Sequence, residues 1–288
     1  MTTLETAAAT TAPDVAPDAT SATAAVPLTL SAPVNLRDLG GTAVAGGVVR
    51  PGVVLRADDL STADAATAEA LVADGLRAVI DLRSADELAL TGRGVLAARP
   101  QVTYHHVPFL ANIGHAATTG DAAPGGDPAD LLDQSRFGAL YLRMYEGAAA
   151  QIVTALAVVA YSPGTVAFHC AAGQDRTGVL AAALLLTLGA DEEAVVADYA
   201  RTGESSAAIQ RRLAPVMAPL LARFGVDLEA AARAATRTTF SPAPMRELLA
   251  ALVERHGDPL APLRAAGLTD GLVDRLRERA LVPATGVA

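Results

Sequence analysis

The chain has 288 residues, of which 51% are hydrophobic and only 3% aromatic, so aliphatic side chains must build most of its core. Its formal net charge is −9, which argues against nucleic acid or an anionic membrane as a general partner, although one site can still be locally positive. The longest apolar stretches, residues 152–161 and 178–190, are shorter than the about 18 residues of a membrane span, and no secretory signal is apparent.

The first two thirds of the chain predict a disordered tail followed by alternating strands and helices. Residues 1–27 are mostly Ala, Thr, Pro and Asp without periodicity, which is typical of disorder. Short apolar runs predict strands at residues 53–56, 77–82, 102–107 and 165–169. Helices are predicted at residues 63–74 with Thr62 as N-cap, at 137–161, and at 176–188, ending at Gly189. Residues 114–130 predict a mobile loop. The alternation predicts an α/β fold whose central, mostly parallel sheet is flanked by helices.

From residue 191 onward the strand signals fade, and the sequence predicts a helical C-terminal region. Its helices are expected at residues 191–201, 206–223, 228–236, 244–255, 259–266 and 270–281, the last with Thr269 as N-cap. Pro215 and Pro219 predict a kink or a split in the second of them. We expect residues 28–288 to form one domain with 191–288 as a helical extension. The helix at 206–223 is a candidate lid, with permanent packing on the core as the alternative.

The segment with the most chemical information is residues 169–178, which read His-Cys-Ala-Ala-Gly-Gln-Asp-Arg-Thr-Gly. An apolar strand leads to Cys170, small residues allow a tight turn, and a helix begins near Arg176. Such a turn can present backbone N–H groups to an oxyanion, and the helix N-terminus adds positive charge. The same field favours the thiolate form of Cys170, which could attack phosphorus while Arg176 binds two phosphate oxygens. The predicted phosphate-binding residues are Ala171, Ala172, Gly173, Gln174, Asp175 and Arg176.

This pattern resembles the protein tyrosine phosphatase superfamily, and its loop is similar to that of a bacterial branch of tyrosine and dual-specificity phosphatases. Further segments are similar to that branch in type and order, at residues 35–41, 50–52, 55–58 and 79–84. The resemblance implies a cysteine-phosphatase fold, a phosphocysteine intermediate, and a phosphorylated protein or small phosphomonoester as substrate, with no cofactor. One position departs, because Gln174 stands where the branch usually has Lys. Since that lysine is associated with phosphoinositide substrates, phosphoinositides are a weaker candidate here than phosphotyrosine.

The leaving group of such a reaction needs a proton, and several aspartates are candidate donors. The resemblance implies Asp175 inside the loop, whose alternative role is that of a carboxylate at a helix N-terminus. Asp81, at a strand end, is the second candidate, and it could instead hold the site through Arg83. The third group lies on the predicted mobile loop and consists of Asp121, Asp127 and Asp130.

Two residues beside the loop are expected to support it. His169 either orders the loop around Cys170 or is an ordinary histidine at a strand end, and Thr177 could donate a hydrogen bond to the sulfur. The segment from Asn35 to Asp38 either braces the site or only caps a turn.

The histidines and the single cysteine predict no metal site. The five histidines show no metal-ligand spacing, and the single cysteine excludes internal disulfides. One cysteine also fits a reducing cytoplasm, which is the expected location. Two other functions stay open: a rhodanese-like sulfurtransferase, which typically has a shorter cysteine loop, and a non-catalytic phosphate-binding module, which needs no nucleophile.

Overall fold

The computed structural model describes residues 28–109, 137–223 and 240–284. The predicted tail at 1–27, the predicted loop at 114–130 with its three aspartates, and the predicted helix at 228–236 lie outside the described residues.

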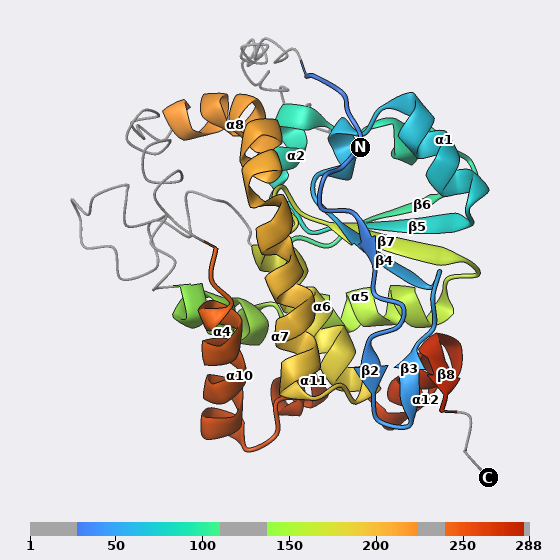
Figure 1. Ribbon diagram of the computed structural model, residues 1–288, viewed down its shortest axis with the longest axis vertical. Coiled ribbons are helices and arrows are strands. Elements are labelled where there is room, and N and C mark those ends of the chain that lie inside the picture. The colour runs from blue at the N-terminus through green and yellow to red at the C-terminus, as the bar shows by residue number, and fades with distance from the viewer. Residues whose placement is uncertain (1–27, 110–136, 224–239, 285–288) are drawn as a thin grey trace, which may run out of the picture.

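A five-stranded sheet forms the centre of the structure (Figure 1). Its strand order is β1-β4-β7-β5-β6, and every neighbouring pair is parallel except β1 with β4. The strands are β1 (Arg37–Asp38), β4 (Val54–Ala57), β5 (Leu76–Asp81), β6 (Thr103–His106) and β7 (Thr165–His169). The predicted mostly parallel sheet is confirmed. The fully buried β7 pairs with two strands, which is why its apolar run was so clear in the sequence.

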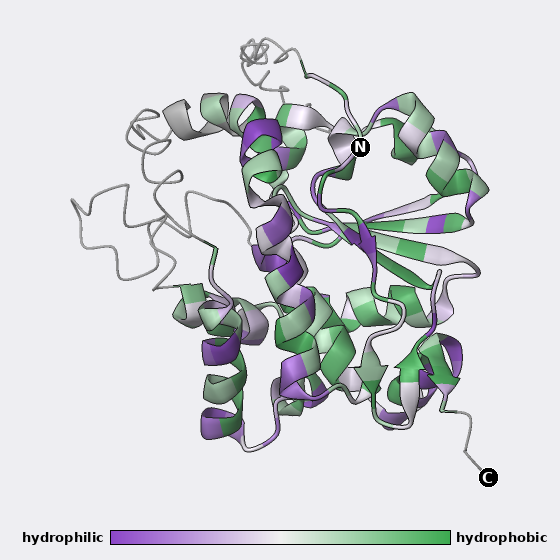
Figure 2. Cartoon of the chain, in the orientation of Figure 1, coloured by the Kyte–Doolittle hydropathy of each residue, from purple (hydrophilic) through white to green (hydrophobic). Residues whose placement is uncertain are grey.

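Helices cover both faces of this sheet. Figure 1 shows α1 (Ala65–Ala73) on one side and α5 (Ala149–Tyr161) and α6 (Asp175–Leu188) on the other. The hydropathy colouring is green along the central strands and α5, as expected for surfaces buried on each other (Figure 2). The prediction of Thr62 as N-cap was wrong. Asp64 caps α1 by accepting a hydrogen bond from Thr67 N at 2.8 Å, whereas Thr62 belongs to the preceding 3₁₀ helix, Leu60–Thr62.

The long helical segment predicted at residues 137–161 consists of two helices. α4 (Phe137–Gly147) and α5 meet at Ala148 with a bend of 73°. Gly147 at the end of α4 favours this break because glycine is a poor helix former. The two halves then follow different partners, since α4 packs on α10 (Ala243–His256) and α5 on α12 (Asp270–Ala280). Among the described helices none is by itself long and apolar enough to cross a membrane; the bent pair α4 and α5 meets that test only when taken together.

The C-terminal third is helical, as predicted. Besides α10 and α12 it contains α7 (Glu192–Ala200), the 3₁₀ helix Arg201–Ser205, α8 (Ser206–Arg223) and α11 (Ala261–Ala265). Thr269 caps α12, accepting from Leu272 N at 3.2 Å. α8 stays one helix despite Pro215 and Pro219, so the predicted split was wrong, and Figure 1 shows instead that the helix changes direction along its length.

A second, three-stranded sheet was not predicted. It consists of β2 (Ala43–Val44), β3 (Gly47–Val49) and β8 (Leu281–Pro283), in that order. The chain comes so close at Gly47 that an added Cβ would lie 2.0 Å from Val282 O. The fading of strand signals after residue 191 was therefore misleading, because a three-residue strand is too short to show a period of two. This sheet ties the end of the described chain to its N-terminal part.

Candidate active site

The turn between β7 and α6 takes its shape from one glycine. Gly173 has φ of 68°, a left-handed conformation that strains any residue with a side chain. There is also no room for one, since an added Cβ would lie 2.6 Å from both Ala57 O and Asp58 N, just after β4. The turn is therefore pressed against the end of a neighbouring strand, and only glycine satisfies both conditions.

The backbone of this turn is polarised. The carbonyl groups of residues 171–174 all accept hydrogen bonds from the protein around them. Backbone N–H groups donate to two of them: Asp59 N to Ala171 O at 3.1 Å and Gly178 N to Gln174 O at 2.8 Å. Side chains donate to the other two: Asn35 Nδ2 to Ala172 O at 3.4 Å and to Gly173 O at 3.0 Å, and Arg56 Nη2 to Gly173 O at 2.8 Å. Within the described part of the chain, the N–H groups of residues 171–174 donate to no protein acceptor. Free N–H groups in a tight turn ahead of a helix form an anion-binding nest.

A buried ionic network holds the back of the turn. Arg56 has no exposed surface, and besides Gly173 O its guanidinium pairs with Asp198 of α7. Asp198 also pairs with Arg37 Nε at 3.0 Å. Burial by itself would raise the pKa of Asp198, but Arg56 and Arg37 hold it below its ordinary value. Two arginines and one carboxylate thus fix the direction of the Gly173 carbonyl.

In the segment from Asn35 to Asp38, one residue braces the turn and another caps turns, so both predicted roles occur. Asn35 braces the turn through its side-chain amide, as described above. Asp38 caps turns instead, accepting from Gly40 N at 2.8 Å and from Gly52 N at 2.6 Å. Sequence analysis missed Arg56 and Asp198 as partners of the turn, although the segment at 55–58 was noted.

Cys170 lies at the bottom of the turn with 1% of its surface exposed. Thr177 Oγ1 donates to its sulfur over 3.2 Å, so the predicted contact is present. His169 is buried as well, and its Nδ1 lies 3.3 Å from Leu60 N and 3.1 Å from Cys170 O. His169 therefore contacts the backbone of the turn at Cys170 and the backbone of the neighbouring 3₁₀ helix at Leu60, which fits an ordering role.

Glu87 fixes the orientation of the Arg176 guanidinium. Both guanidinium Nη atoms bind the Glu87 carboxylate, with Nη2 to Oε1 at 2.8 Å. Glu87 is itself fixed by the capping box of α2 (Ala85–Thr91), where its Oε2 accepts from Ser84 N at 2.7 Å. Burial would raise the pKa of Glu87, yet Arg176 and Ser84 N–H keep it below its usual range. The side chain of Arg176 remains 12% exposed, so it is not sealed off from solvent.

The pKa values of the two described candidate acids are shifted in opposite directions. Asp175 accepts a hydrogen bond from Tyr141 OH at 2.5 Å, and burial raises the pKa of Asp175 although Tyr141 and Arg176 act the other way. Burial would also raise the pKa of Asp81, but His169, Arg83 and Tyr104 outweigh it and leave the pKa far below its ordinary value. Asp81 is therefore held as a carboxylate by Arg83, with Nη2 to Oδ2 at 2.6 Å, and is unsuited to donating a proton.

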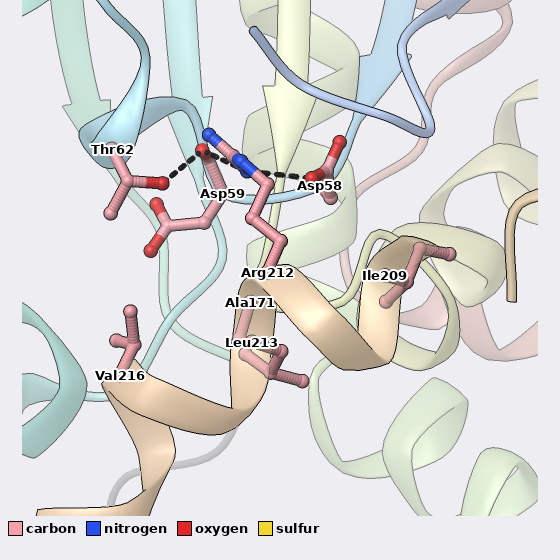
Figure 3. Close-up of a pocket in the computed structure, with 8 residues that line it drawn as sticks. All are labelled: Asp58, Asp59, Thr62, Ala171, Ile209, Arg212, Leu213 and Val216. Carbon is pink, nitrogen blue, oxygen red and sulfur yellow. Dashed lines mark hydrogen bonds and ion pairs between the residues drawn. The ribbon is translucent and has the colours of Figure 1, made fainter. Parts of the chain in front are cut away.

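The first turns of α8 lie against the mouth of the site. Arg212 reaches from α8 to Asp58 Oδ2 at 2.6 Å and to Asp59 O at 2.9 Å, as Figure 3 shows. Around it is a pocket with about 210 Å³ of empty space, which the phosphate loop touches through Ala171. Its other lining residues are Asp58, Asp59, Thr62, Ile209, Arg212, Leu213 and Val216. A second pocket, of about 200 Å³, shares Asp59, Ala171 and Val216 and extends to Glu87 and α2.

Comparison with known proteins agrees with this geometry. A sequence model of the tyrosine phosphatase family matches residues 28–282. The triple specificity protein phosphatase PtpB of Mycobacterium tuberculosis is 29% identical to this chain over 270 residues, which cover 84% of this chain and 95% of that protein. The family match spans the sheet, the loop and the C-terminal helices.

Proposed function

Because the chain belongs to the tyrosine phosphatase family, we propose that it removes phosphate from protein phosphotyrosine through a phosphocysteine intermediate on Cys170. The observation that carries the proposal is the backbone polarity of the turn. Its carbonyls are bonded outward and its N–H groups at residues 171–174 are left free, directly after the cysteine. Such a turn binds the oxygens of a phosphate group above the sulfur.

In the first step the Cys170 thiolate attacks phosphorus, and an S–P bond forms while the P–O bond to the tyrosine breaks. The phosphoryl oxygens are held by the free N–H groups and by those guanidinium N–H groups of Arg176 that do not bind Glu87. Asp175 gives its proton to the departing phenolate oxygen. Its raised pKa, caused by burial, favours the protonated form that this role requires.

In the second step water attacks phosphorus and the S–P bond breaks. Asp175, now a carboxylate, takes a proton from that water, because the same group acts in both directions. The Thr177 hydroxyl, 3.2 Å from the sulfur, stabilises the thiolate as it leaves. Inorganic phosphate is released and the starting state is restored.

Substrate breadth is the finer part of the proposal. The relative from Mycobacterium tuberculosis is named a triple specificity protein phosphatase, which supports a substrate range wider than phosphotyrosine. We propose phosphoserine and phosphothreonine as the additional protein substrates. Phosphoinositides rank lower, because Gln174 brings no positive charge to the loop and Asp58 and Asp59 line its mouth. We expect peptide substrates to be turned over faster than phosphoinositides.

The test is phosphate release from 4-nitrophenyl phosphate, phosphotyrosine, phosphoserine and phosphothreonine peptides and a phosphoinositide. Phosphatase activity should be lost in Cys170→Ser and fall by about 10³-fold or more in Arg176→Ala, because both side chains contact the phosphate group in the proposed reaction. A thiosulfate sulfurtransferase assay runs in parallel. Sulfur transfer without phosphate release would refute the proposal, and so would full phosphatase activity in Cys170→Ser.

A further inference from the structure

A chain of hydrogen bonds behind the loop ends on the proposed acid. Tyr141 OH, from α4, donates to Asp175 Oδ1 at 2.5 Å. Tyr199 OH, from α7, lies 2.8 Å from Tyr141 OH. The Gln174 side chain lies close enough to Tyr199 to act on the pKa of its hydroxyl as a hydrogen-bond donor does. Both tyrosines are buried, with at most 1% of their surface exposed. The chain begins and ends inside the phosphate loop, at neighbouring residues, and passes through two helices between them.

The direction of the donors in this chain follows from proton counting. A phenol has one proton, so once Tyr141 donates it to Asp175, Tyr199 must donate its own to Tyr141. The Tyr199 oxygen can then only accept from Gln174, whose side-chain amide supplies N–H. Burial, together with the nearby Asp175, raises the pKa of both tyrosines, so both hydroxyls keep their protons at neutral pH. All donors therefore point toward Asp175 Oδ1.

We propose that Tyr141 and Tyr199, with Gln174, are positioning residues that fix the Asp175 carboxyl and place its transferable proton on Oδ2. Because Oδ1 already accepts from Tyr141, a proton on Oδ1 would compete with that hydrogen bond. The free oxygen is then the one that carries the proton to the leaving group. This inference rests on the proposed function, since it needs Asp175 as the acid.

The charged and titratable surroundings of Asp175 are few. Arg176 lies next to it on α6, Tyr141 faces it from α4 and Tyr199 from α7. Arg56 of β4 acts on Tyr199, while Glu87 of α2 and Cys170 act on Arg176. Tyr141 is the direct hydrogen-bond donor from another element, so its hydroxyl is the group to remove.

Another tyrosine of α4 provides a matched control for removing the Tyr141 hydroxyl. Tyr145 lies one turn further along α4 and is also fully buried, but its OH donates to Pro259 O at 3.0 Å, away from the site. Tyr141→Phe and Tyr145→Phe therefore each delete one buried hydroxyl from the same helix. The measurement is the pH dependence of kcat/KM on two substrates: a phosphotyrosine peptide, whose leaving phenol has a pKa of about 10, and 4-nitrophenyl phosphate, whose leaving group needs less help from an acid.

We expect Tyr141→Phe to lower kcat/KM on phosphotyrosine by about tenfold or more and to change it little on 4-nitrophenyl phosphate. The basic limb of its pH profile of kcat/KM should move to higher pH, because loss of the Tyr141 donor destabilises the Asp175 carboxylate and so raises the pKa of Asp175. Tyr145→Phe should move neither the limb nor the ratio of the two substrates. Tyr199→Phe, which leaves the Tyr141–Asp175 bond in place, should act in the same direction more weakly, and it decides the matter if Tyr141→Phe does not fold.

The positioning role would be overturned if Tyr141→Phe lost the same factor in kcat/KM on both substrates and its basic limb stayed at the wild-type pH. That result would leave the proposed function standing as long as Cys170→Ser is inactive. An active Cys170→Ser would instead overturn the proposed function itself, so the two failures are distinguishable.

Discussion

The phosphate loop is held differently on its two sides. On the side of β4 and α7, Asn35, Arg56 and Asp198 are nearly or fully buried and bond the loop or each other. On the side of α8, the polar contacts among the described residues come from one arginine, Arg212, whose side chain is 10% exposed and binds the loop's neighbours rather than the loop. The shape of the turn is therefore fixed from the side of β4 and α7, and we propose that α8, on the other side, is where access to the site can change.

The largest effect is expected from breaking the buried side. Arg56→Met would leave the Asp198 carboxylate buried with Arg37 alone and remove a donor from Gly173 O. We expect a loss of about 3–5 kcal/mol in the free energy of unfolding, because an uncompensated buried charge is costly, and a fall in kcat as the loop loosens. Urea denaturation and steady-state kinetics measure the two. The control is Arg99→Met, which breaks an exposed pair with Glu69. Equal stability of the two variants would refute the bracing role.

A smaller effect on stability, but a clear one on rate, is expected from Glu87→Gln. Glutamine keeps an oxygen for Ser84 N but cannot bind both Nη atoms of Arg176 as an acceptor. Misaiming the guanidinium should lower kcat/KM by about 10²-fold. Unchanged kcat/KM would show that Arg176 is aimed without Glu87.

The same variant tests the pH dependence of stability. The pKa of Glu87 is held below its usual range in the folded protein, so the stability it contributes is present above the unfolded-state pKa and is lost as pH falls through the folded-state value. Urea midpoints measured from about pH 6 to about pH 3 should therefore fall less steeply in Glu87→Gln than in the wild-type protein, because the pH window of this loss lies below the ordinary glutamate pKa of about 4.3. Parallel curves would contradict this.

Some of these contacts were visible in the sequence and others were not. Cys170, Thr177 and the helix ending at Gly189 follow one another along the chain, so a local pattern was enough to predict their arrangement. Glu87 was not predicted as a site residue, because its partner Arg176 is 89 positions away. Tyr141 sits in an apolar helix, where a buried tyrosine is ordinary. Pairings of this kind depend on how distant elements pack, and a single sequence does not encode them locally.

The smallest effect is expected on the α8 side. Arg212→Ala removes the contacts with Asp58, Asp59 and Ser31 and should cost about 1–3 kcal/mol, because the buried Asp58 carboxylate loses its arginine while Arg212 itself is 10% exposed. If α8 is a lid, amide hydrogen exchange should speed up in α8 while β7 stays protected, and iodoacetamide should alkylate Cys170 faster. Arg211→Ala, at the exposed neighbouring position, is the control. An α8 that remains as protected as β7 in the Arg212→Ala variant would mean that this helix is permanently packed.

The most direct test of the account is to trap the phosphoenzyme. A phosphotyrosine peptide is mixed with excess enzyme, the reaction is stopped with acid within milliseconds, and the phosphorylated residue is located by mass spectrometry. We predict phosphate on Cys170, none in Cys170→Ser, and less in Arg56→Met than in wild type because the nest has lost its brace. Rapid phosphate release with no label on Cys170, or label on another residue, would contradict the account.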